Sequence, residues 1–166
     1  EGSWFFITIN CVPRGANQLC RAGVGDAVLA AMRSNHGKLA WHCRLCLLMP
    51  DHLHAILAFP PEPGMTATIK NWKKYLAVTE GMKWQRDFFD HRLRSDESAE
   101  EKSHYILMNP VRAGLVANPE DWPFSWRGCL LKARRPSLNP SARATTRCVC
   151  CVPAVLESRF KEPSNR

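Results

Sequence analysis

Two histidines separated by one residue, His52 and His54, are the side chains of this sequence best suited to bind a metal ion. Successive side chains of a β-strand point to opposite faces, so a His-x-His pair on a strand projects both imidazoles from one face. Two neutral imidazoles held close together make half of a divalent-metal site. The surrounding segment, residues 47–57, is apolar, so we expect a buried or half-buried strand to carry the pair. The alternative is a pair of histidines that is simply solvated on the outer face of that strand.

A tyrosine and an asparagine in the segment 105–116 could complete such a site. Tyr105 and Asn109 are four residues apart, so on a helix they share a face. A hydroxyl nucleophile and an amide oxygen side by side would complete the site that the two histidines begin. Structural interpretations remain open for both residues. Tyr105 could be a half-buried packing residue, and Asn109, with Pro110 after it and Gly114 further on, matches a helix N-cap, a first-turn proline and a C′ glycine.

The eight cysteines do not form a recognisable zinc module. Cys43 and Cys46 have the C-x-x-C spacing, but they lie in an apolar strand candidate, where free cysteine is a common small core residue. The other close group, Cys148, Cys150 and Cys151, lies near the end of the sequence in a stretch without periodicity. We therefore expect reduced thiols in a cytoplasmic protein.

Composition and charge narrow the class of protein. The chain has 166 residues, 45% of them hydrophobic and 23% charged, as in a globular protein with one domain and a real core. Its longest apolar stretch is far shorter than the roughly 20 residues that cross a membrane. There are 23 Lys and Arg against 15 Asp and Glu, a net charge of +8. This excess favours polyanionic partners, nucleic acid first and acidic membrane surfaces second; a merely basic surface is the alternative.

The elements that would position these residues follow a known order. The pattern predicts strands at 4–12, 41–49 and 52–59, and helices at 25–36 and from Thr66 or Thr68 to about Thr79. A short strand and a turn follow within 82–94. Ser95 or Asp96 then begins a helix that we expect to run to Asn109, because Pro110 disfavours its continuation. This order is the ferredoxin-like split βαβ pattern: an α+β fold with an antiparallel sheet, helices on one face, and an extra helix that carries the tyrosine.

The character of the sequence changes near residue 128. We expect one domain at 1–128, followed at 129–166 by a basic tail that contains Pro and Cys and shows no periodicity. Such a composition is typical of a poorly ordered segment.

Three motifs in this order resemble the single-tyrosine HUH transposases and, within them, the REP-associated tyrosine transposases. They are MPDHLH at 49–54, WQRDFFDHRLR at 84–94 and YILMNPVRAGLV at 105–116. The segment DWPFSW at 121–126 also resembles the sequence that comes after the tyrosine helix in that family. The resemblance spans roughly 4–128 and implies a ferredoxin-like fold that acts on single-stranded DNA, usually REP palindromes folded into hairpins.

The resemblance also implies roles for individual residues. His52, His54 and Asn109 would bind Mg²⁺ or Mn²⁺, and Tyr105 would attack the scissile phosphate to leave a 5′-phosphotyrosine and a free 3′-hydroxyl. Free tyrosine has a pKa of about 10, so reaction at neutral pH needs the field of the metal. Neutral histidines suit Mn²⁺ better than Mg²⁺, so we expect activity with both and tighter binding of Mn²⁺.

Basic residues are expected to bind the DNA strand, with an ordinary solvated face as the alternative. The candidates are Lys70, Lys73 and Lys74 on the second helix and Arg92, Arg94 and Arg112 in the motifs. The family implies a monomer or a homodimer, with Tyr105 acting in its own subunit or in its partner's. We expect a cytoplasmic, nucleoid-associated protein with no membrane partner.

The sequence is also compatible with three other functions. The first is a domesticated protein that binds hairpin DNA without cutting it. The second is a metal-dependent hydrolase that uses water as the nucleophile and is indifferent to Tyr105. The third is a truncated copy that keeps its active-site residues but no longer recognises its DNA.

Overall fold

The computed structural model describes residues 3–94 and 99–128, so the predicted tail at 129–166 and the predicted helix caps Ser95 and Asp96 lie outside the described residues. The elements are β1 (Trp4–Asn10), α1 (Val24–Gly37), β2 (His42–Met49), β3 (His52–Ala58), α2 (Gly64–Thr79), β4 (Phe89–Arg92), α3 (Ala99–Leu107), α4 (Asn109–Arg112), a 3-10 turn (Pro119–Asp121) and β5 (Ser125–Arg127).

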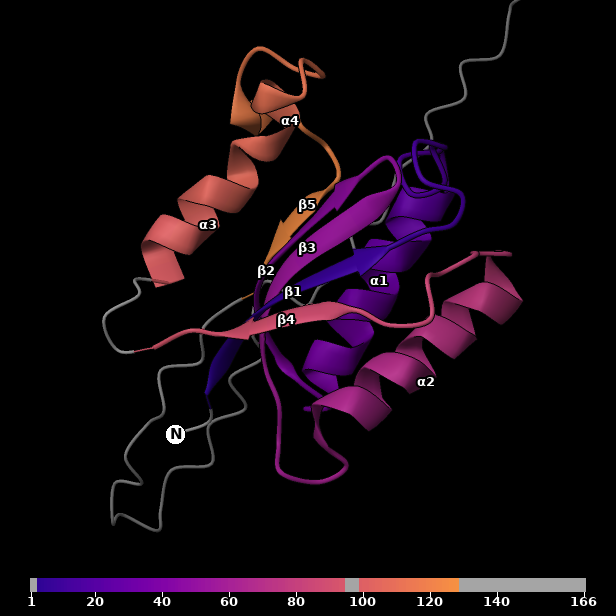
Figure 1. The fold of residues 1–166 in the computed structure, drawn as a ribbon, viewed down its shortest axis with the longest axis vertical. Helices are drawn as coiled ribbons and strands as arrows, with labels where there is room; N and C mark the ends of the chain where they lie inside the picture. Colours follow the sequence, from indigo (N-terminus) through magenta and orange to yellow (C-terminus); the bar gives the residue numbers. More distant parts are fainter. Residues whose placement is uncertain (1–2, 95–98, 129–166) are drawn as a thin grey trace, which may run out of the picture.

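The strands form one antiparallel sheet in the order β4-β1-β3-β2-β5. Its first four positions have the strand order of the ferredoxin-like fold, so the predicted α+β class is confirmed. Helices α1 and α2 cover one face of the sheet, while α3 and α4, drawn in salmon, lie on the other side (Figure 1). The short strand β5 extends the sheet beyond β2 and was not predicted.

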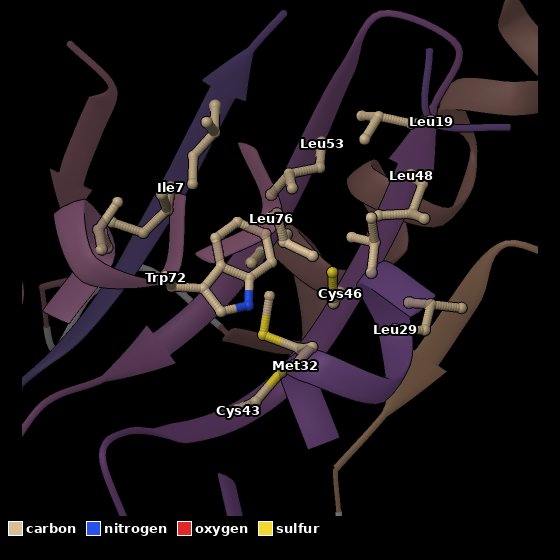
Figure 2. Close-up of a cluster of buried hydrophobic side chains, with 14 of the residues drawn as sticks. Ile7, Leu19, Leu29, Met32, Cys43, Cys46, Leu48, Leu53, Trp72 and Leu76 are labelled. Atoms are coloured by element: carbon tan, nitrogen blue, oxygen red, sulfur yellow. The ribbon is translucent and has the colours of Figure 1, made fainter. Parts of the chain in front are cut away.

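The larger hydrophobic core lies between the sheet and the helices α1 and α2. Alternate residues of β1 and β3 point into it, among them Ile7, Ile9, Leu53 and Leu57. Trp72 and Leu76 of α2 meet them from the other side (Figure 2). Cys43 and Cys46 are free, buried thiols in this core, as predicted.

A smaller core on the opposite face positions α3. Leu45, Leu47 and Met49 of β2 and Ile56 of β3 are buried there against Ile106 of α3. Partly buried side chains around them complete this contact: Trp4, Phe6, Leu93, Leu107 and Trp122. The apolar residues of α3 therefore fix the tyrosine-bearing helix on the even-numbered residues of β3.

The prediction of one continuous helix to Asn109 is wrong in detail. Helix α3 ends at Leu107, and the four-residue helix α4 begins at Asn109. Met108 keeps right-handed helical angles (φ −78°, ψ −6°). Pro110 has no N–H to donate to the preceding turn, so the hydrogen-bond ladder is interrupted there. Within the described ranges, no helix combines the length and the apolar character that crossing a bilayer requires.

Candidate metal and tyrosine site

His52 and His54 lie on the face of the sheet that α3 covers, hereafter the histidine face. They alternate with Leu53 and Ala55 of the larger core, and they precede Ile56, which packs against α3. The two imidazole centroids are 4.9 Å apart. The strand prediction for the pair is therefore confirmed, with both rings on one face.

Each histidine has its Nδ1 atom engaged by a neighbouring side chain. The His52 Nδ1 atom is 2.7 Å from Asp51 Oδ1, and the His54 Nδ1 atom is 3.0 Å from Thr8 Oγ1. A carboxylate only accepts hydrogen bonds, so His52 donates through Nδ1 and keeps its lone pair on Nε2. The Thr8 hydroxyl can accept in the same way from His54. Metal-binding histidines characteristically make such outer hydrogen bonds, which orient the ring and fix its tautomer.

Both carboxylate oxygens of Asp51 have partners. Its Oδ2 atom accepts a hydrogen bond from the Gly15 N–H at 2.7 Å and lies 3.0 Å from Arg14 Nε. Burial acts to raise the pKa of Asp51, but the hydrogen bonds from Gly15 and His52 and the charges of His52 and Arg14 outweigh it and lower that pKa. The carboxylate is therefore ionised and anchors His52 to the loop after β1.

His54 is held as a neutral imidazole. Burial, and then the charges of His52 and Arg14, lower the pKa of His54 to about 4. Its ring stacks on Phe6 with centroids 5.4 Å apart. Neutral imidazole is the form that binds metal ions, so this environment suits a ligand.

Tyr105 lies on α3 and is 49% exposed. The Lys102 ammonium is 5.7 Å from the centroid of the Tyr105 ring and 5.3 Å from that of Phe6, the ring that stacks on His54. The Arg112 guanidinium also lies over the Tyr105 ring, 4.4 Å from its centroid. The tyrosine is thus accessible to a substrate and lies next to two cations, one of which, Lys102, also contacts the ring that stacks on His54.

Asn109 has an unused hydrogen-bonding group. Its Nδ2 atom is buried and has no partner in the described part of the chain, while Oδ1 is 3.5 Å from Arg112 Nη1. No three His, Cys, Asp or Glu side chains within the described ranges come together as a metal-binding group. The third ligand expected from the sequence, the Asn109 amide, is the first residue of α4. Two imidazoles and one amide oxygen are a donor set suited to Mn²⁺ and acceptable to Mg²⁺.

The structure separates the basic residues that were predicted to bind DNA. Arg112 lies at the tyrosine. Lys70 and Lys74 are exposed on α2, on the far side of the sheet. Arg92 lies opposite Phe5 in the register of β4 against β1, and Phe5 packs against the larger core, so the Arg92 side chain is also on the α1 and α2 side of the sheet. Arg94 is exposed just after β4.

Lys73 has a structural role that the sequence did not indicate. It is 8% exposed, and its ammonium donates to the backbone carbonyls of Gln85, Arg86 and Asp87 at 2.7, 2.9 and 3.4 Å. Burial lowers the pKa of Lys73, against the opposing effect of the Asp87 charge. The lysine holds the segment before β4 onto α2.

Sequence reasoning missed three residues that support the site: Thr8, Phe6 and Asp51. Asp51 was visible as the carboxylate next to His52. Phe6 and Thr8 alternate with the apolar Ile7 and Ile9, which places them on the second face of β1. Only the register of β1 against β3, which pairs Thr8 with His54, makes them neighbours of the site.

The fold and site together define an α+β protein in which a paired-histidine strand faces a tyrosine-bearing helix. No family model matches the chain. It is 29% identical over 130 residues to the REP-associated tyrosine transposase of Escherichia coli strain K12, covering 75% of each chain. It is 31% identical over 101 residues to a protein of Haemophilus influenzae named for the same class, covering 49% of this chain and 55% of that one.

The fold comparison agrees with the sequence comparison. A solved structure described as a REP-associated tyrosine transposase bound to a REP hairpin matches with a TM-score of 0.66 and 25% identity, over 75% of this chain and 76% of that one. The resemblance predicted from the three motifs is confirmed: in sequence and in fold the chain is similar to the REP-associated tyrosine transposases.

Proposed function

We propose that the chain is a metal-dependent endonuclease and strand transferase for single-stranded DNA, acting on REP-like hairpins through a 5′-phosphotyrosine. The observation that carries this proposal is the histidine pair with both Nδ1 atoms engaged, on the face of the sheet that the tyrosine-bearing helix covers. The names of the relatives, and the REP hairpin in the matched structure, support the class of DNA.

In this proposal Tyr105 is the nucleophile. Its phenolic oxygen attacks the phosphorus, a tyrosine–phosphate bond forms, and the bond from phosphorus to the 3′-oxygen breaks. The phenol gives up its proton to solvent and the departing 3′-oxygen takes one up. Because the new link is itself a phosphodiester, another 3′-hydroxyl can attack it, free the tyrosine and join two strands.

The remaining site residues position the phosphate and the nucleophile. His52, His54 and Asn109 would hold Mg²⁺ or Mn²⁺, which when bound stabilises the negative charge that develops on the phosphate. Arg112 contacts both the Tyr105 ring and the Asn109 amide, so it fixes these two residues relative to each other across the break at Met108. Its positive charge also favours an approaching phosphate.

A covalent-adduct assay tests the proposal. The full chain is incubated with REP-like hairpin DNA and Mn²⁺, with separate substrates labelled at the 3′ or the 5′ end. We expect the 3′-labelled fragment to remain on the protein in a denaturing gel and the 5′-labelled fragment to be released. Tyr105→Phe should abolish the adduct. Tyr75→Phe is the matched control, because Tyr75 is the other tyrosine of the chain and lies exposed on α2.

Results that contradict the proposal distinguish the alternative functions from one another. Cleavage by Tyr105→Phe without an adduct would mean that water is the nucleophile and the chain a hydrolase. Hairpin binding without cleavage by the unaltered chain would mean a DNA-binding protein that does not cut. His54→Ala should weaken Mn²⁺ binding in a calorimetric titration, a readout that does not depend on activity.

A further inference from the structure

An exposed phenylalanine lies beside the histidine pair and has no role in the mechanism above. Phe89 is the first residue of β4 and is 57% exposed. Strand β4 is at the edge of the sheet, and within the described residues it pairs with β1 alone. Exposed aromatic side chains on edge strands favour unwanted association, so this one calls for an explanation.

The strand register places Phe89 on the histidine face. Thr8 of β1 pairs with Phe89 on one side and with His54 on the other, so the three residues form one row across the sheet. Thr8 is the residue that hydrogen-bonds His54. Directly opposed residues of an antiparallel pair point to the same face, so the Phe89 ring is on the side where Tyr105 is presented.

Ring contacts connect Phe89 to His54. Phe6 meets the Phe89 ring edge-on at 6.3 Å and stacks on the His54 ring at 5.4 Å. The Lys102 ammonium sits 5.3 Å over the Phe6 ring. A row of aromatic surface therefore runs from the candidate metal ligand to the edge of the sheet, with a cation above it. Aromatic rings beside positive charge are the combination with which proteins bind single-stranded nucleic acid.

We propose that Phe89 is a stacking platform for an unpaired base next to the phosphate that Tyr105 attacks. This inference rests on the proposed function and adds to it a contact that positions the single strand at the open edge of the sheet. A stacked base is held by its flat face, so the platform accepts any of the four bases and sets the position of the strand without reading its sequence.

The adjacent Phe88 provides a matched control. It is half-buried and packs into the larger core, on the face of the sheet away from the histidines. Phe88 and Phe89 are the same residue type, neighbours in sequence, and directed to opposite faces. A change at Phe88 therefore reports what the loss of a phenylalanine at the start of β4 does to the protein without altering the histidine face.

Photocrosslinking tests the platform. Hairpin DNA with a single-stranded flank carries 5-iododeoxyuridine at one flank position at a time, and the full chain is irradiated with each oligonucleotide and digested with trypsin. We expect one position to crosslink to the peptide of residues 87–92, at Phe89. Phe89→Leu should remove this crosslink and weaken binding about 5- to 150-fold, the effect of one stacked base. Phe89→Trp and Phe88→Leu should retain it.

Each outcome either supports or overturns the platform, separately from the mechanism. A crosslink at Phe89 in a chain that forms no Tyr105 adduct supports the platform and contradicts the proposed function. An adduct that forms while Phe89→Leu binds DNA with unchanged affinity overturns the platform alone. A change in oligomeric state on Phe89→Leu, with unchanged DNA affinity, would also overturn it, because Phe89 would then belong to an interface between copies.

Discussion

His54 depends on a hydroxyl from another strand for its orientation. Thr8 holds its Nδ1 atom, and Phe6, two residues earlier on β1, stacks on its ring. A ring fixed on two sides presents Nε2 in one direction. Outer hydrogen bonds of this kind typically contribute about 10- to 100-fold to metal affinity or activity.

Thr8→Val should therefore impair the proposed metal site while leaving the fold intact. The valine has nearly the same shape, but it cannot hydrogen-bond Nδ1 of His54. We expect the Mn²⁺ concentration needed for half-maximal adduct formation to rise about 10- to 100-fold. Thr8→Ser, which keeps the hydroxyl, should stay close to the unaltered chain. An unchanged Mn²⁺ titration in Thr8→Val would show that Thr8 does not orient the ligand.

Replacing Lys73 should destabilise the fold more than replacing the exposed lysines of the same helix. Lys73→Met keeps most of the side-chain volume but leaves the carbonyls of residues 85–87 without their donor. We expect the free energy of unfolding in urea to fall by about 1.5–3 kcal/mol, the range for hydrogen bonds to a charged group. The exposed neighbours give the controls, and Lys70→Met and Lys74→Met should stay within about 0.5 kcal/mol. Equal free energies of unfolding for all three variants would show that the hydrogen bonds of Lys73 do not stabilise the fold.

At the scale of elements, α3 is fixed to the sheet mainly by its apolar side. Ile106 is fully buried against β2 and β3, and Arg44 of β2 pairs with Glu100 in the first turn of α3. Helix α3 has nine residues, too few to be stable in water without such packing. The position of Tyr105 is therefore a consequence of the smaller core, and changes at Ile106 should shift the proposed nucleophile without altering its side chain.

A hydrogen bond between α1 and β2 should make the stability of the fold depend on pH. Near the end of α1, His36 accepts a hydrogen bond from the Cys43 N–H at 3.0 Å through Nδ1, which requires the neutral ring. Burial, and then the nearby His42, lower the pKa of His36 from its ordinary value of 6.5. The unfolded chain takes up a proton there before the folded chain does. This part of the stability is therefore complete above pH 6.5 and is lost as the pH falls below it.

Urea unfolding at several pH values checks this. His36→Asn offers an amide oxygen to the same N–H and does not titrate, so the decline below pH 6.5 should become shallower. The exposed His104 on α3 is the control, and His104→Gln should keep the original dependence. His54, whose pKa burial lowers from 6.5 to about 4, has its own slope between these two pH values, and His36→Asn should retain it. Identical pH profiles for the three proteins would contradict the assignment.

At the scale of the molecule, a net charge of +8 makes binding to DNA dependent on salt. Each phosphate contact contributes about 0.7 to the slope of log affinity against log salt for a single strand. Arg112→Ala should lower that slope by about this amount, because Arg112 lies at the tyrosine. Lys38, exposed beyond α1 on the far side of the sheet, is the control, and Lys38→Ala should leave the slope unchanged. Equal slopes for both variants would place Arg112 off the path of the strand.

Much of this molecule could be predicted because its signals are local. Alternation around His52 and His54 predicted the strand and the shared face of the two rings, and the pattern from Thr66 or Thr68 to Thr79 predicted helix α2. The features that were missed depend on distant parts of the chain. Thr8 and His54 are 46 residues apart, and their contact follows from strand register. Lys73 is buried only because the segment 85–87 folds over it. Strand β5, with three residues, is too short to leave a periodic signal.

The cysteines of the described core have a consequence for how the folded state can be followed in time. Burial is the main cause that raises the pKa of Cys11, Cys20 and Cys46 to about 12 and that of Cys43 well above its ordinary value. At pH 7 a thiol with a pKa of 12 is a thiolate in about one molecule in 10⁵, and thiolate is the reactive form. Alkylating reagents therefore react with these thiols only after the protein opens and exposes them. The rate at which Cys43 and Cys46 are labelled measures how often the sheet and α1 separate, without any probe having to be introduced.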